Sequence, residues 1–199
     1  MTKGDDTRQH ILTRAAGLAT QIGLEGLSIG QLATDLGMSK SGLFAHFQSK
    51  QELQTQVVDF ARERFLDTVV RPALAAPRGE PRVRALFERW IRWPLESKLP
   101  GGCFFVAAAT ELDDRPGPVR DALVRAQRDW VDLLASTVRA AGAEGHFRAD
   151  IDGEQFAQEL YGILLGYHHY ARLLGDRASR KRAELAFEAL VARAKTRSR

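Results

Sequence analysis

Cysteine is nearly absent from this sequence, which has one, Cys103, among 199 residues. One cysteine cannot form a disulfide within the chain, so the chain fits a reducing compartment. The sequence also has no run of about 18 apolar residues, the length that spans a membrane. Residues 1–10 lack the apolar stretch of a signal peptide. We therefore expect a cytoplasmic protein that does not interact with membranes.

The residue sets that build enzyme and metal sites are missing as well. We find no nucleophile paired with a base, no phosphate-binding loop and no cluster with metal-ligand spacing, and Gly101-Gly102 does not fit a cofactor motif. His168 and His169 are neighbours, so on a helix they point about 100° apart and do not chelate one ion. We expect no enzyme activity, no cofactor and no metal. Cys103 has no second cysteine to pair with, which favours a structural thiol, although a redox-sensing role stays open.

Runs of alternating β-branched residues are also missing, and apolar residues spaced three and four apart dominate instead. This periodicity predicts an all-α protein, with helices at about 7–22, 28–36, 39–47, 50–70, 82–93, 104–112, 119–141, 153–174 and 178–194. Three prolines and a glycine between Arg71 and Pro81 mark the main boundary. We expect Pro72 to end one helix and Pro94 to end another.

Residues 28–47 have the pattern of a helix, a short turn and a second helix. Ser28 is a good N-cap, and Gly37-Met38-Ser39 has the glycine that a sharp turn between helices requires. The second helix begins with small and polar residues, 39–42, which is unusual for a core helix. Such a helix start fits the major groove of DNA, where hydroxyl and amine groups reach phosphates and base edges. The alternative is a helical corner within a core.

Several residues around this motif occur in an ordered pattern over the four helices of residues 7–60. They are Ile11-Leu12, Ala15-Ala16, Gly23, Gly26, Ser28-Ile29, Leu32-Ala33, Leu36-Gly37-Met38-Ser39, Gly42, Leu43-Phe44, His46-Phe47, Lys50 and Leu53. In this pattern the stretch resembles the DNA-binding region of the tetracycline-repressor (TetR) family. The resemblance implies an all-α homodimer. Its N-terminal three-helix helix-turn-helix domain, 1–50, would be joined by a bridge helix, about 50–70, to a C-terminal helical ligand-binding and dimerisation domain, 71–199.

The resemblance also implies which residues contact DNA. They are Ser28, Ser39, Lys40, Ser41, Gly42, Phe44, His46 and Lys50, with Gln31 and Thr34 as additional candidates. Phe44 stands where the family often has Tyr, so a hydrogen bond from a phenol to phosphate is not available here. Taken singly, His46 and Lys50 fit a solvated surface nearly as well as a phosphate contact.

Bulk charge gives the DNA prediction little support. Residues 1–50 contain five basic and four acidic residues, although the whole chain has a net charge of +4. The basic surplus lies in residues 172–199, with nine basic residues against three acidic ones. We interpret that segment as a solvated helix and tail, with a minor electrostatic role left open. The DNA prediction therefore depends on motif geometry.

The helix at 153–174 is the candidate dimer interface, because a single helix-turn-helix makes few base contacts and two half-sites need a two-fold dimer. Gly162 and Gly166 are four residues apart and would allow a partner helix to approach closely. The predicted interface residues are Phe156, Leu160, Gly162, Ile163, Gly166 and Tyr167. The alternative is a helix of the intramolecular core.

Large aromatic residues beside the predicted helix breaks form the candidate effector site. We expect Trp90, Trp93, Phe105 and Trp130 to line a cavity for an apolar ligand, although a packed core is lined in the same way. Polar anchors for the ligand would come from Glu111, Gln127, His168 or His169. We expect such an effector to shift the helix at 82–93 and the bridge helix, so that the two DNA-reading helices move apart.

Together these features predict a transcriptional regulator. We expect a repressor of a nearby operon that binds palindromic double-stranded operator DNA as a homodimer. A small apolar or amphipathic effector, not identified by the sequence, would release it. The alternatives are a helix-turn-helix regulator without a small-molecule ligand, controlled by a protein partner, and an activator.

Overall fold

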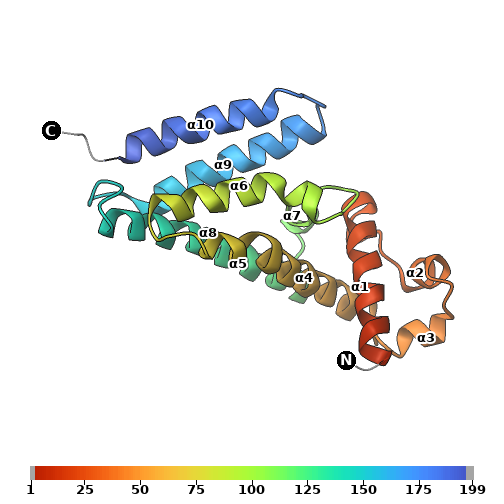
Figure 1. Cartoon of the computed structure of the whole chain (residues 1–199). Helices are drawn as coiled ribbons and strands as arrows, with labels where there is room; N and C mark the ends of the chain where they lie inside the picture. The colour runs from red at the N-terminus through yellow and green to blue at the C-terminus, as the bar shows by residue number, and fades with distance from the viewer. Residues whose placement is uncertain (1–2, 196–199) are drawn as a thin grey trace. The chain divides into compact units, whose positions relative to one another are not determined.

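The computed structural model describes residues 3–195 of the 199, and within them all regular secondary structure is helical (Figure 1). This confirms the all-α prediction. None of the helices in this range is long and apolar enough to cross a membrane. In chain order the helices are α1 Lys3–Ile22, α2 Ile29–Asp35, α3 Lys40–Phe44, α4 Lys50–Phe65, the π-helical turn η1 Leu66–Val70, α5 Arg71–Leu74, α6 Glu80–Glu96, α7 Phe104–Leu112, α8 Pro118–Ala143, α9 Gly153–Arg172 and α10 Ser179–Ala194.

The chain divides into two compact units, each made of two segments. The first unit combines residues up to 65 with 97–126, and the second combines 66–96 with residues from 127 onward. α7 therefore belongs to the same unit as α1–α4, although nearly 40 residues separate it from the end of α4 in the sequence. The functional division at 1–50 and 71–199 stays a prediction, because the compact units are defined by packing alone.

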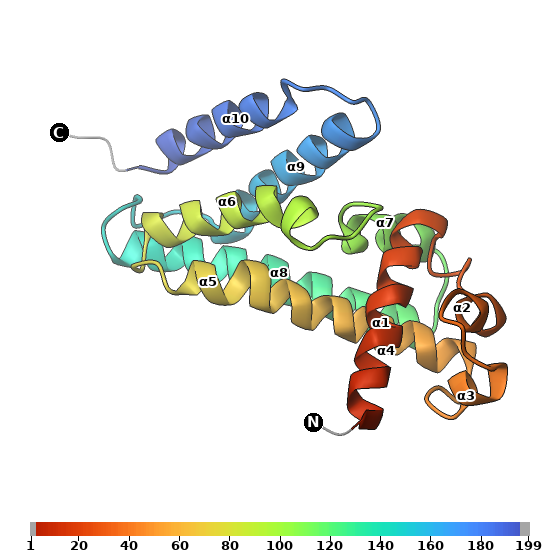
Figure 2. The same ribbon diagram turned by 45° about the vertical axis from the view of Figure 1, so that its right-hand side comes forward.

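The first unit has a core formed by one face of each of its helices. α1 packs on α4 and on α7, and α2 packs on α3 (Figure 2). The side chains spaced three and four apart in α1 face inward, so Ile11 and Ala15 are fully buried, as is Leu53 of α4. Burial of each large apolar side chain of this kind stabilises the fold by about 1.5–3 kcal/mol. α2 and α3 are held against this core.

The second unit is built mainly from α6, the later part of α8, α9 and α10. α9 and α10 run side by side and antiparallel (Figures 1 and 2). Phe87 of α6 stacks on Phe187 of α10 with ring centroids 4.1 Å apart. Arg84 of α6 donates hydrogen bonds to the carboxylate of Glu188 on α10, so apolar and ionic contacts together hold these helices.

Three predicted helix ends are wrong. The helical path runs through η1 and continues past Val70 into α5, because Pro72 lies in the first turn of α5, where a missing N–H costs least. α6 passes through Pro94 and ends two residues later at Glu96, so the missing N–H of the proline and its clash with the carbonyl four residues earlier disturb only the last turn. α3 ends at Phe44 rather than Phe47, and Phe47 is buried in the turn that leads to α4.

Candidate nucleic-acid interface

α2 is capped by the residue that precedes it, Ser28, and packs on the core through one face. The Ser28 hydroxyl accepts the backbone N–H of Gln31 at 3.1 Å, as an N-cap does. Leu32 and Ala33 are almost completely buried. Gln31 and Thr34 lie on the exposed side. α2 therefore presents a polar face to solvent and keeps its apolar face for packing.

The turn between α2 and α3 is formed entirely by neighbouring residues. Gly37 adopts φ +63°, a conformation that glycine tolerates best, and the Met38 N–H donates to Ala33 O at 2.9 Å. Ser39 is the N-cap of α3, and its hydroxyl accepts the Gly42 N–H at 3.0 Å. These contacts set the direction of α3 relative to α2.

α3 buries one side chain and leaves the others exposed or partly exposed. Leu43 is fully buried, whereas Phe44 is 49% exposed. Lys40 and Ser41 are exposed, and the Ser41 hydroxyl lies 3.2 Å from that of Ser39. Gly42 is half-buried. One buried residue anchors α3 to the core, and its other side chains face solvent, as binding in a DNA groove requires.

Lys40 lies across α2 beside Gly30. A Cβ added to Gly30 would be 3.1 Å from Lys40 Cε and 3.5 Å from its Nζ, so the glycine leaves room for the lysine side chain. Lys40 makes no ion pair with any residue in the described range. The sequence did not single out Gly30, because its role depends on the angle between α2 and α3.

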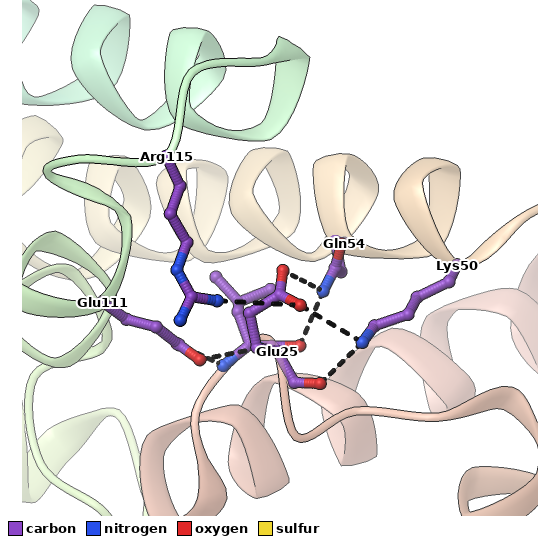
Figure 3. A network of polar contacts seen from close by, with 6 residues as sticks. Glu25, Lys50, Gln54, Glu111 and Arg115 are labelled. Atoms are coloured by element: carbon purple, nitrogen blue, oxygen red, sulfur yellow. Dashed lines mark hydrogen bonds and ion pairs between the residues drawn. The ribbon is translucent and has the colours of Figure 1, made fainter.

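His46 and Lys50, which follow α3, contact residues outside α3. His46 is half-buried, with its ring centroid 6.3 Å from that of Phe47. The Lys50 ammonium donates to the backbone oxygen of Glu25 at 2.6 Å and lies 3.4 Å from the Glu25 carboxylate (Figure 3). Lys50 thus has a structural partner within the chain, and its phosphate contact stays a prediction, as do the other seven DNA contacts.

An ion pair that the sequence did not indicate joins α1 to the end of α2. The Arg14 guanidinium donates to both carboxylate oxygens of Asp35. These hydrogen bonds hold the pKa of Asp35 below its ordinary value of 3.8. The pair is exposed to solvent, so it orients α2 more than it stabilises the fold.

The four aromatic residues predicted to line an effector cavity are all buried. Trp90 and Trp93 of α6 and Trp130 of α8 belong to the second unit, whereas Phe105 of α7 belongs to the first. Phe105 packs edge-on against Phe65, with ring centroids 5.6 Å apart. Burial fits both a cavity wall and a packed core, so the cavity stays a prediction.

Three of the side chains predicted to anchor a ligand are hydrogen-bonded or half-buried within the chain. Gln127 accepts a hydrogen bond from the Tyr161 hydroxyl at 2.8 Å. His168 is half-buried, and its burial lowers the pKa of its imidazole. Glu111 binds backbone amides with both carboxylate oxygens, so it has a structural role within the chain, and its role as a ligand anchor stays a prediction.

The predicted dimer residues of α9 fall into two groups. Phe156 and Leu160 are buried inside the second unit, at 2% and 0% exposure. The other four reach the surface: Gly162 is exposed, and Ile163, Gly166 and Tyr167 are half-buried. Those three line a groove between α9 and α10 with a volume of about 360 Å³.

Cys103 is buried and stands at the N-cap of α7. Its side chain makes no capping hydrogen bond. Within residues 3–195, no group of three or more His, Cys, Asp or Glu side chains has the arrangement of a metal site.

Comparison with known proteins identifies both parts of the chain. Residues 11–57 match the family model "Bacterial regulatory proteins, tetR family", and residues 79–187 match "Tetracyclin repressor-like, C-terminal domain". The chain is 24% identical over 172 residues to the HTH-type transcriptional repressor NemR of Escherichia coli (strain K12), and the match covers 84% of this chain and 85% of NemR.

Solved structures show the same fold. The crystal structure of a TetR-family transcriptional regulator from Cytophaga hutchinsonii has a TM-score of 0.86 at 19% identity, covering 100% of this chain and 99% of that one. A crystal structure of AibR in complex with isovaleryl coenzyme A and operator DNA has a TM-score of 0.72 at 22% identity, covering 93% of this chain and 96% of AibR.

Proposed function

The chain belongs to the TetR family of DNA-binding transcriptional regulators, which are not enzymes, and from this premise we propose that it is a repressor of a nearby operon. A homodimer binds palindromic operator DNA through α3 of each protomer. A small apolar or amphipathic effector releases it. NemR, its relative, is a repressor, which supports this direction of control over activation.

The exposed face of α3 is the observation that carries the DNA-binding role. Lys40 and Ser41 project from a helix whose single buried residue, Leu43, fixes it to the core. Lysine pairs with guanine O6 and N7, and serine with several base edges. Each good base contact of this kind contributes about 1–3 kcal/mol of discrimination.

Exposed apolar side chains on α9, just after it and on α10 support the homodimer. Leu165, Leu173, Leu174 and Leu185 are 38–72% exposed, and Tyr170 is 50% exposed. Large apolar side chains that form a contiguous exposed patch often mark a protein–protein interface. A two-fold pairing of this surface would bury them and present two copies of α3 to half-sites one helical turn apart.

The effector part of the proposal has two supports. Four large aromatic residues are buried in the segments where the cavity is predicted, and the fold relative AibR has been crystallised with both an acyl coenzyme A and operator DNA. Control by a protein partner without a small ligand is the alternative. Operator affinity measured against a set of apolar and amphipathic compounds separates the two, because only the effector hypothesis predicts release by a compound.

The DNA-binding proposal is tested by a gel shift with the DNA upstream of the chain's own gene. The double substitution Lys40→Ala with Ser41→Ala should weaken binding at least about tenfold, the equivalent of one lost base contact. Lys98→Ala with Ser136→Ala is a matched control, because it removes the same side-chain types from exposed positions outside the motif. Unchanged binding by the first variant, with the dimer intact, would show that α3 does not read this DNA.

A further inference from the structure

The short segment between α1 and α2 is held by side chains from two other helices. The Glu111 carboxylate, near the end of α7, accepts two consecutive backbone N–H groups of this segment. Oε2 accepts from Leu24 at 2.7 Å, and Oε1 accepts from Glu25 at 2.8 Å (Figure 3). Both oxygens are therefore occupied by the backbone that leads into α2.

Gly23 makes room for this carboxylate. Its φ is +80°, and a Cβ at this position would lie 2.6 Å from Glu111 Oε1 and 2.9 Å from Oε2. Any larger residue would push the carboxylate off the amides. Gly23 thus ends α1 and also opens the space for a contact from α7.

The carbonyl groups of the same two residues bind α4. Gln54 Nε2 donates to Leu24 O at 2.8 Å in a buried position, and Lys50 Nζ donates to Glu25 O at 2.6 Å. Residues 24 and 25 therefore have their amides on α7 and their carbonyls on α4. We call this set of contacts, formed by Leu24, Glu25, Lys50, Gln54 and Glu111, the backbone clamp.

A second contact fixes the chain before α7 to the last turn of α1. The Gly101 N–H donates to the Thr20 hydroxyl at 2.8 Å, in a buried position. A Cβ on Gly101 would lie 1.8 Å from Thr20 O, so the two backbones are as close as glycine permits. Both the approach to α7 and its far end are thus attached around the end of α1.

The position of α7 in the sequence shows which parts of the chain the backbone clamp connects. α7 lies within residues 79–187, which match the C-terminal domain of the family, yet it packs in the first unit with the helix-turn-helix. The clamp is therefore a direct link between the segment matched as the C-terminal domain and the backbone that carries α2 and α3. It is separate from the covalent link through the bridge helix.

We propose that Glu111 is a positioning residue for operator binding: by holding the amides of Leu24 and Glu25, it fixes α2, and α3 with it, in the place that fits DNA. This inference rests on the proposed DNA-binding function. A movement of α7 that withdraws the carboxylate would release the start of α2 without unfolding either helix. Glu111 touches no DNA in this scheme and acts only through the backbone.

The test uses the full-length dimer and the substitution Glu111→Gln, which keeps the size of the side chain and removes its charge. Asp114→Asn is the matched control, because it makes the same chemical change at an exposed position three residues later. The first readout is hydrogen exchange of single amides. We expect exchange at Leu24 and Glu25 to become at least tenfold faster in Glu111→Gln. The Met38 amide, bonded to Ala33 within the motif, should be unchanged.

The second readout is affinity for genomic DNA fragments selected by the wild-type dimer. Glu111→Gln should bind them at least tenfold more weakly at an unchanged dimer content, and Asp114→Asn should bind as the wild type does. A general loss of stability would instead speed exchange at Met38 as well, and would overturn the positioning role.

The outcomes separate the two proposals. If the wild type selects no DNA, the proposed function is wrong and the positioning role falls with it. If the wild type binds and Glu111→Gln binds equally well, the inference alone is overturned. Unchanged exchange at Leu24 and Glu25 in Glu111→Gln would also overturn it, since the clamp would then not hold these amides.

Discussion

Two turns flank α2, and they are stabilised in opposite ways. The turn from Gly37 to Ser39 uses only contacts within the motif, such as the Ser39 hydroxyl on the Gly42 N–H. The turn after Gly23 depends on Glu111 and Gln54, which lie 87 and 30 residues from Leu24 along the chain. Local contacts therefore fix α3 relative to α2, whereas distant contacts fix α2 on the first unit.

The two turns therefore have different roles. The turn before α3 sets the shape of the DNA-reading motif, and the turn before α2 places that motif on the first unit. A motif whose internal turn is self-contained keeps its shape when its surroundings move. A motif whose entry turn is held by distant helices changes place when those helices move. The pair of turns thus allows α2 and α3 to move together as one body, and substitutions in each turn should have different consequences.

The largest difference is expected between two glycine substitutions. A Cβ on Gly26 would lie 2.3 Å from Ile22 O, a backbone atom that cannot move aside, whereas a Cβ on Gly37 meets nothing within 4 Å. We expect Gly26→Ala to lower the free energy of unfolding by about 3 kcal/mol through overpacking. Gly37→Ala should lower it by about 1 kcal/mol, through its positive φ alone. Urea denaturation followed by circular dichroism measures both, and an equal loss would contradict the comparison.

The next effect concerns the cap of α3. Ser39→Ala removes the acceptor for the Gly42 N–H and should lower the free energy of unfolding by about 1 kcal/mol. Ser41→Ala is its control, because the Ser41 hydroxyl touches only that of Ser39 and caps no amide. Hydrogen exchange at Leu24 should be the same in both variants. Faster exchange at Leu24 in Ser39→Ala would mean that the two turns are coupled.

The smallest effect is a pH dependence at the end of α2. Arg14 holds the pKa of Asp35 below 3.8, so the pair stabilises the fold at pH values above 3.8. That contribution is lost as the pH falls through the lowered pKa of the folded state. The melting temperature of the wild type should exceed that of Asp35→Asn slightly at pH 7, and the difference should vanish in strong acid. A difference that persists in acid would assign the effect to something other than the ion pair.

The difference between the two turns also explains which features of the site could be predicted from the sequence and which could not. Ser28, Gly37 and Ser39 act through neighbours in the chain, so their residue types alone predicted the motif correctly. Gly23 was named only as part of the family pattern, because its role in making room for Glu111 depends on a carboxylate 88 residues further on. Glu111 was expected to hold a ligand, since a sequence does not show which backbone a distant carboxylate will reach.

The same limit applies to surfaces and helix ends. Periodicity located α9, but it did not separate Phe156 and Leu160, which are buried within the unit, from Gly162, which is exposed. Lys50 was expected to face phosphate, and the structure places its ammonium on Glu25. Prolines near helix ends misled the prediction at Pro72 and Pro94, because the cost of a proline depends on its position within the final helix.

A structure of the dimer bound to a genomic DNA fragment that it selects is the most direct test of the central claim. Our account predicts that α3 of each protomer lies in the major groove, with Lys40 and Ser41 at base edges and the Glu111 carboxylate on the amides of Leu24 and Glu25. A complex in which α3 lies outside the groove would contradict it.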